Sequence, residues 1–209
     1  MIFNILPLGL SKYNPDEKLG WLSDYYAYSK KLEMNFWRYN TYSSAILDYK
    51  AGKDHHLDFF VSPFISLIEE IIRIENIGKI ILVPLPSSKP KFNKDYRITP
   101  NEDNDPKKNR DDRNLVFCEK VSKVREDWQS IELIERIKLK DSKNQRSIEQ
   151  QLSTLSINSI EHITQNTTII LMDDVYTSGG TMKASKMLIK KSLGDIKMIG
   201  VVLGRTVIC

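Results

Sequence analysis

The chain of 209 residues has few cysteines and no long hydrophobic run. Its two cysteines, Cys118 and Cys209, form no CxxC pair, so we expect neither a zinc site nor a disulfide framework, as is typical of a reducing compartment. The most apolar stretch, residues 59–68, is broken by serine and proline and is far shorter than the roughly 20 residues that span a bilayer. Residues 1–10 lack the basic region of a signal peptide, so we expect a cytoplasmic protein without membrane contact.

Neither sign of charge is in large excess. Lysine and arginine number 31 against 27 acidic residues, a net charge of +4, which is compatible with an anionic small molecule and requires no nucleic acid. Even the charged segment 86–113 balances basic with acidic side chains, which argues against a nucleic-acid groove there. Hydrophobic residues at 41% and charged residues at 28% are ordinary for a globular protein and exclude a disordered chain.

Aromatic residues are concentrated at the start of the chain. Residues 1–56 hold seven of the nine tyrosines and two of the three tryptophans. We interpret this segment as a small N-terminal cap or hood packed on the main domain, with an aromatic lid over a planar ligand as the alternative. Residues 57–209 are then the core domain.

The core domain alternates between helical and strand patterns. Apolar residues at helical spacing predict helices, which cover residues 57–76, 115–124 and 181–193. Continuous apolar runs predict buried strands, which cover residues 79–85, 168–172 and 198–203. Pro63 fits the first turn of its helix, Gly194 fits a C-terminal cap, and Ile148, Leu152 and Leu155 have helical spacing. Residues 131–139 fit a strand or a helix. The alternation predicts an α/β fold with a mostly parallel sheet flanked by helices.

The most informative segment is Ile169–Thr181, in which a buried strand ends at two adjacent acids, Asp173 and Asp174. A turn rich in hydroxyls and glycine follows, and a helix begins directly after it. The turn consists of Thr177, Ser178, Gly179, Gly180 and Thr181. The two glycines permit positive φ and a close approach to a ligand, and the N–H groups at the helix start favour a phosphate. Because carboxylates repel phosphate, we expect them to accept hydrogen bonds from the hydroxyls of a neighbouring sugar.

Three other interpretations of this segment are weaker. A P-loop needs a lysine before its last hydroxyl residue, where this chain has Gly180. A response-regulator receiver needs more chain after its paired acids than follows Asp174. An ordinary turn with an N-capping serine or threonine explains the glycines and hydroxyls, but it gives no reason for two acids.

The segment resembles the phosphoribosyl pyrophosphate motif of type I phosphoribosyltransferases, and the chain is most similar to their ComF-like branch, which is related to amidophosphoribosyltransferases. Residues 79–206 carry the resemblance. The further matching segments are Val83–Pro86, Arg113–Leu115, Leu133–Lys138 with Gln145, and Gly204–Thr206. The chain departs from many ComF-like proteins because it lacks their four-cysteine zinc ribbon, and it has Lys89, Lys91 and Lys94 where the branch has arginines.

The resemblance implies a Rossmann-like fold and an enzyme that takes 5-phosphoribosyl 1-pyrophosphate with Mg²⁺ and transfers phosphoribose to a nitrogenous acceptor. Residues 177–181 would bind the 5-phosphate, and Asp173 and Asp174 the ribose hydroxyls. Ser87, Ser88 and Lys89 would lie near the pyrophosphate. A mobile loop would close the site, either residues 96–113 or, as we favour, residues 138–146 with Lys138, Lys140 and Lys143. The resemblance also allows a homodimer.

The alternative function is a phosphoribosyl-ligand sensor without catalysis, or an accessory protein in DNA uptake or processing, to which ComF-like proteins are linked as a family. Two further features carry less weight. His55 and His56, between Asp54 and Asp58, look like metal ligands, but adjacent histidines point apart in regular structure, so we expect a surface turn. His162 is isolated, and we expect it to be structural.

Overall fold

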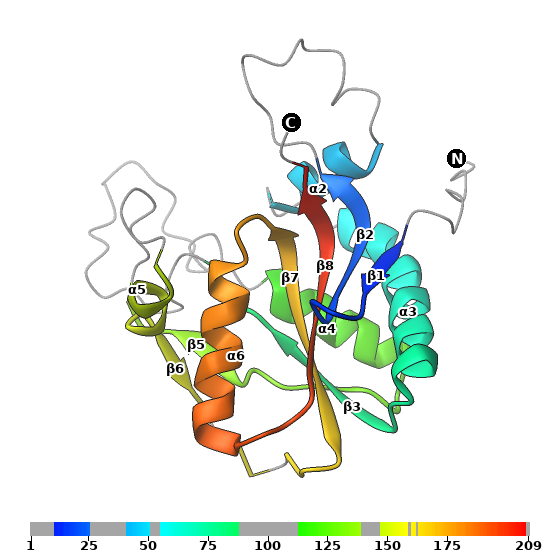
Figure 1. The fold of residues 1–209 in the computed structure, drawn as a ribbon. Helices are drawn as coiled ribbons and strands as arrows, with labels where there is room; N and C mark the ends of the chain where they lie inside the picture. Colours follow the sequence, from blue (N-terminus) through cyan, green and yellow to red (C-terminus); the bar gives the residue numbers. More distant parts are fainter. Residues whose placement is uncertain are drawn as a thin grey trace, which may run out of the picture.

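The computed structural model describes residues 11–25, 41–50, 55–87, 113–138, 147–158, 160–161 and 163–207. Its helices are α2 (Thr41–Lys50), α3 (His55–Glu75), α4 (Arg113–Val124), α5 (Ile148–Leu152) and α6 (Gly180–Leu193). Its strands are β1 (Lys12–Asn14), β2 (Leu19–Tyr25), β3 (Lys79–Pro84), β4 (Gln129–Ser130), β5 (Ile134–Arg136), β6 (Leu155–Ile157), β7 (Thr167–Tyr176) and β8 (Met198–Thr206). Figure 1 shows their arrangement.

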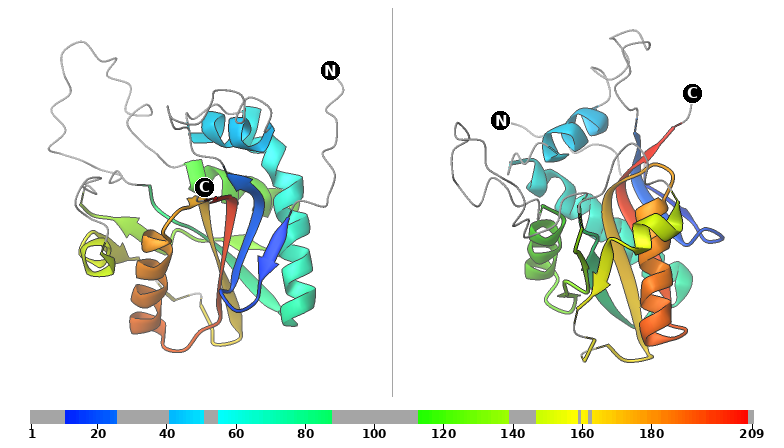
Figure 2. Two further views of the ribbon diagram at one scale, coloured as in Figure 1. Left: turned by 45° about the horizontal axis from the view of Figure 1, so that its top comes forward. Right: turned by 90° about the vertical axis from the view of Figure 1, so that its left-hand side faces the viewer.

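Six strands form one sheet in the order β1-β2-β8-β7-β3-β4, and β5 and β6 form a small antiparallel pair. Within the large sheet only β1 is antiparallel to its neighbour. Helices α2, α3 and α4 cover one face, while α6 and the β5–β6 pair cover the other (Figure 2). Successive residues of β3 face opposite cores, as Ile80 and Leu82 pack with α3 and α4 while Ile81 and Val83 pack with α6. The predicted α/β fold with a mostly parallel sheet is therefore confirmed.

Part of the aromatic N-terminal segment belongs to the main sheet. β2 pairs in parallel with β8, from Leu19 opposite Gly200 to Tyr25 opposite Thr206. The next described element, α2, packs across the carboxyl end of β8, where a Cβ placed on Gly204 would lie only 2.7 Å from Ile46. Residues 12–25 thus extend the sheet, and α2 is the described element that lies over its carboxyl edge. The division of the chain at residue 56 stays a prediction.

The local predictions are confirmed for the three helices and three strands of the core; most of them extend beyond the predicted ends, whereas α3 and β3 each end one residue earlier than predicted. Pro63 is an exception, because α3 begins at His55 and places this proline in the interior of the helix. His55 and His56 accordingly start a helix, where we expected a surface turn. The ambiguous residues 131–139 contain strand β5, and Leu155 belongs to β6 and not to a helix. Gly194 caps α6 with a φ of 76°, as predicted.

Two observations bear on the environment of the chain. None of the helices that the structure describes has the length and hydrophobicity needed to cross a membrane. Cys118 is a free thiol on the buried face of α4, and burial raises its pKa, so it packs as a small apolar side chain. Cys209 lies outside the described residues.

Candidate ligand site at the carboxyl ends of β3 and β7

The neighbouring strands β3 and β7 lie at a reversal of strand order. From β3 the chain passes through α4 to β4, on the outer side of β3. From β7 it passes through α6 to β8, in the opposite direction and over the opposite face of the sheet. Open α/β sheets bind ligands outside the carboxyl ends of two strands whose connections diverge in this way. The motif that follows β7 therefore lies where the topology itself favours a ligand site.

The turn after β7 leads directly into α6. Gly179 has a φ of 71° and is the N-cap of α6, whereas Gly180 is already the first helical residue. Positive φ was expected of both glycines, and it is confirmed for Gly179 alone. A Cβ on Gly179 would lie 2.4 Å from the ring of Tyr176, so both the backbone conformation and the neighbouring ring disfavour a side chain there. The first N–H groups of α6 point out of this turn, as they do at any helix start.

The hydroxyls of the turn do not act as helix caps. Thr177 and Ser178 are exposed, and α6 has no side-chain hydrogen bond at its N-cap. Helix α5 shows the contrast, because Ser147 and Gln150 form a complete capping box there. An ordinary N-capping turn therefore does not account for Thr177, Ser178 and Thr181, which leaves their hydroxyls available as donors to an anion.

Replacing Gly179 by alanine should destabilise the protein by about 1–2 kcal/mol, because alanine resists positive φ and its methyl group would displace Tyr176. Thermal unfolding of the purified variant measures the loss. Gly78→Ala is the matched control, because a Cβ at Gly78 meets nothing within 4 Å. Equal melting temperatures for the two variants would show that the turn tolerates a side chain.

The acid pair lies at the edge of the sheet, and its two carboxylates have different surroundings. Asp174 is 8% exposed; one oxygen accepts the N–H of Val175 at 2.6 Å and the other binds Arg113 at 3.1 Å. Asp173 is half-buried and accepts the N–H of Asp174 at 2.9 Å. Burial and the neighbouring charge of Asp174 raise the pKa of Asp173 to about 7. Asp173 is thus the more accessible acid, and its charge changes near neutral pH.

The residues that hold the acid pair come from the start of α4. Arg113 binds Asp174 and also donates to the carbonyl of Lys50 at 2.9 Å. Asn114 donates to the carbonyl of Leu85 at 2.9 Å and to Asp173 at 3.4 Å. The sequence alone did not identify either residue as part of the site. A signal for Asn114 existed, because it occupies the same helical stripe as the buried residues Phe117, Cys118 and Val121.

A second buried cation lies near the segment that follows β3. Arg136 is only 3% exposed; it donates to the carbonyl of Ser87 and to the hydroxyl of Thr154. Burial lowers its pKa to about 10, and the charge of Asp173 acts in the opposite direction. Ser87 therefore lies beside a positive charge, consistent with the anionic end of a ligand. The sequence signal for this position was weak, because residues 133–137 read LIERI and place two charged residues, Glu135 and Arg136, between apolar ones.

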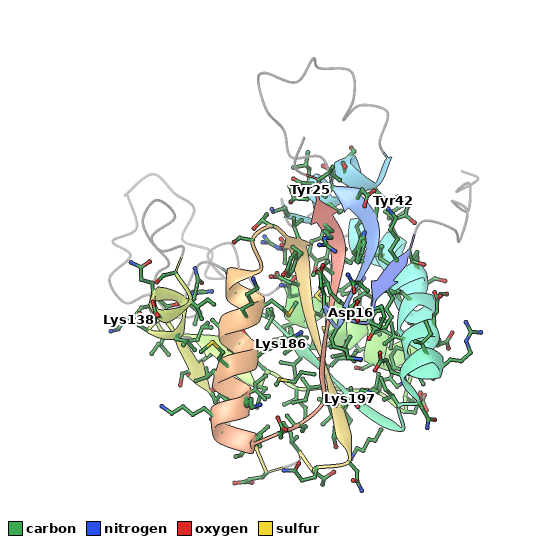
Figure 3. The ribbon with its side chains drawn as sticks, viewed as in Figure 1. Asp16, Tyr25, Tyr42, Lys138, Lys186 and Lys197 are labelled. Carbon is green, nitrogen blue, oxygen red and sulfur yellow. The ribbon has the colours of Figure 1, made fainter. Side chains whose placement is uncertain are left out.

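The structure does not reach all of the predicted site residues. Ser88, Lys89, Lys140 and Lys143 lie outside the described residues, as does His162. Lys138 is exposed and lies beside α5 (Figure 3). In the part of the chain that the structure describes, no group of three acidic, histidine or cysteine side chains could hold a metal ion.

Comparison with known proteins adds no assignment: no family model matches the chain, and no curated protein is significantly similar to it.

Proposed function

We propose that the protein binds 5-phosphoribosyl 1-pyrophosphate, taken up as its Mg²⁺ complex, and transfers phosphoribose to a nitrogenous acceptor with release of pyrophosphate. The observation that carries the proposal is the arrangement after β7: two acids at the strand end, a turn fixed by Gly179, hydroxyls that cap no helix, and the start of α6. A phosphate at the turn and a diol at the acids are the two ends of a ribose 5-phosphate unit.

The reaction mainly requires that the protein position the sugar and stabilise the charge on the leaving pyrophosphate. The nitrogen of the acceptor forms a bond to C1 of the ribose while the bond from C1 to the pyrophosphate oxygen breaks, and pyrophosphate leaves with the electron pair. The turn at residues 177–181 and the acid pair would fix the sugar from two sides. Charge that builds up on the leaving group would be stabilised at the end of β3, where Arg136 lies behind Ser87. Mg²⁺ arrives with the substrate and neutralises part of its charge.

The proposal is tested by binding and by turnover. Isothermal titration calorimetry with phosphoribosyl pyrophosphate and Mg²⁺ should show one site. Asp173→Asn should weaken binding about 10- to 100-fold, because a charged hydrogen bond to a hydroxyl contributes about 1.5–3 kcal/mol. Asp195→Asn is the matched control, since Asp195 is exposed at the opposite end of α6. Absence of binding at millimolar ligand, or equal affinities for the two variants, would refute the proposal.

Turnover separates the enzyme from the alternative function. Incubation with Mg²⁺, the sugar donor and a panel of bases should release pyrophosphate repeatedly. Tight binding with no release across the panel would instead support a sensor. The accessory role in DNA uptake would require salt-dependent DNA binding, and a titration at low salt measures it. The nitrogenous acceptor and a homodimer remain proposals drawn from the resemblance, and the cytoplasmic location remains a proposal drawn from the composition and the absence of a long apolar run.

A further inference from the structure

Two parallel chains of hydrogen bonds connect the end of α2 with the acid pair. Tyr49 reaches Asp173 through Asn114, and the neighbouring Lys50 reaches Asp174 through Arg113. Two consecutive residues from each of the elements α2, α4 and β7 thus meet, with the order reversed on α4. The two acids are therefore joined to a helix that precedes them by more than a hundred residues in the chain.

The hydrogen bonds of the Asn114 amide fix its orientation. The hydroxyl of Tyr49 donates to Oδ1 of Asn114 at 2.9 Å, and Nδ2 of Asn114 donates to Leu85 and Asp173. An amide turned by 180° would place its oxygen against the carboxylate and against the Leu85 carbonyl, with no donor between them. Tyr49 and Asn114 are 1% and 6% exposed, so water does not compete for these bonds. Because the Leu85 carbonyl only accepts, it fixes the amide with Nδ2 towards Asp173, and the Tyr49 hydroxyl supplies the donor that the buried Oδ1 then needs.

The charge of Asp173 depends on several groups that face its carboxylate, and the Asn114 amide is one of them. Asp174 lies beside it on β7 and opposes its charge, while Arg113 on α4 and Arg136 on β5 favour that charge. Tyr25 at the end of β2 is near Asp174, whose charge raises the pKa of this tyrosine further than burial alone (Figure 3). Two uncharged donors, the backbone N–H of Asp174 and the amide of Asn114, lower the pKa of Asp173 against the effect of burial, and Asn114 supplies the side-chain one.

We propose that Asn114, held in place by Tyr49, is a positioning residue for Asp173, and that α2 is thereby part of the ligand site although Tyr49 would not touch the sugar. The inference rests on the proposed function for its ligand, but the relay itself can be measured without one. The affinity for a phosphorylated ribose should then depend on the Tyr49 hydroxyl, although Asn114 and Asp173 lie between this hydroxyl and the ligand.

Tyr49→Phe removes this hydroxyl alone and tests the proposal. The titration midpoint of the Asp173 carboxyl carbon, followed by ¹³C NMR, should rise by about half a pH unit or more, because Oδ1 of Asn114 is then buried without its donor and the amide that faces Asp173 is held less firmly. Binding of ribose 5-phosphate should weaken about 3- to 10-fold near pH 7, and the difference from the parent protein should shrink as the pH rises and Asp173 ionises in both. Asn114→Ala should shift the midpoint in the same direction and further.

Tyr42→Phe is the matched control, because Tyr42 is a buried tyrosine of the same helix that lies outside the relay. It should leave the Asp173 midpoint and the affinity unchanged. A folded Tyr49→Phe protein with an unshifted Asp173 midpoint would overturn the relay. If the relay shifts the midpoint but the parent protein binds neither ribose 5-phosphate nor the pyrophosphate, the relay stands and the proposed function fails.

Discussion

Asp174→Asn should lower the free energy of unfolding by about 2–4 kcal/mol, because it removes a charged hydrogen bond between a buried carboxylate and the largely buried guanidinium of Arg113. Arg113→Gln should have a comparable cost, since it leaves the carboxylate of Asp174 buried. Urea unfolding of the single variants and of the double variant measures the interaction. The double variant should lose about 1–3 kcal/mol less than the sum of the two single losses, as expected for residues in direct contact.

The exposed pair of Arg125 and Asp127 provides the comparison. Arg125 binds Asp127 at 3.0 Å, but 63% of the Asp127 side chain is exposed. Its coupling, from the corresponding cycle with Arg125→Gln and Asp127→Asn, should be below about 1 kcal/mol. Strict additivity at Arg113 and Asp174 would mean that the pair is not formed in solution, and that Asp174 is free to engage a ligand without losing this partner.

The second large effect is expected at the other end of the sheet, where Glu75 joins four segments. Its carboxylate binds Lys18 at 2.8 Å, Tyr13 at 2.7 Å and Lys197 at 3.1 Å, and 9% of its side chain is exposed. Lys197 lies at the amino ends of the strands, opposite Tyr25 (Figure 3). Glu75→Gln should therefore destabilise the protein by about 2–3 kcal/mol at pH 7, because charged hydrogen bonds from β1, the β1–β2 turn and the segment before β8 are lost together.

The same cluster predicts acid sensitivity. The hydrogen bond from Lys18, followed by that from Tyr13, lowers the pKa of Glu75 from about 4.5 to about 2. A carboxyl whose pKa is lower in the folded state stabilises the fold above its unfolded pKa. Its contribution is lost as the pH falls from about 4.5 towards 2. Unfolding free energies of the parent protein and Glu75→Gln should therefore converge over this range, while a constant difference would show that charge is not the cause.

The fold could be predicted where single segments carry their own signal. The runs 79–85, 168–172 and 198–203 are apolar apart from Lys79 and Thr168, because strands of a parallel sheet are buried on both faces. Strand β2 was missed because its sequence LGWLSDY includes glycine, serine and aspartate, and only its pairing with β8 makes it a strand. Pro63 was misplaced because a long amphipathic helix tolerates the loss of one N–H when its apolar stripe is buried.

In the site, too, the sequence identifies consecutive residues but not side chains that come together from distant segments. The acids and the turn could be identified because residues 173–181 are consecutive, and the positive φ of Gly179 agrees with that interpretation. The supporting side chains could not, because Tyr49, Asn114 and Arg136 come from three separate elements that meet only in the folded chain. Spacing along a sequence does not show which distant residues meet in the fold. A polar residue on an otherwise apolar helical stripe, such as Asn114, is nevertheless a candidate for such a meeting point.

A crystal structure with ribose 5-phosphate at saturating concentration tests the central claim most directly. The account predicts that the phosphate lies within hydrogen-bond distance of the N–H groups at the start of α6 and of the hydroxyls at residues 177, 178 and 181, with the sugar hydroxyls at Asp173 and Asp174. A phosphate bound anywhere else, or a turn that stays empty while the ligand is in excess, would contradict it.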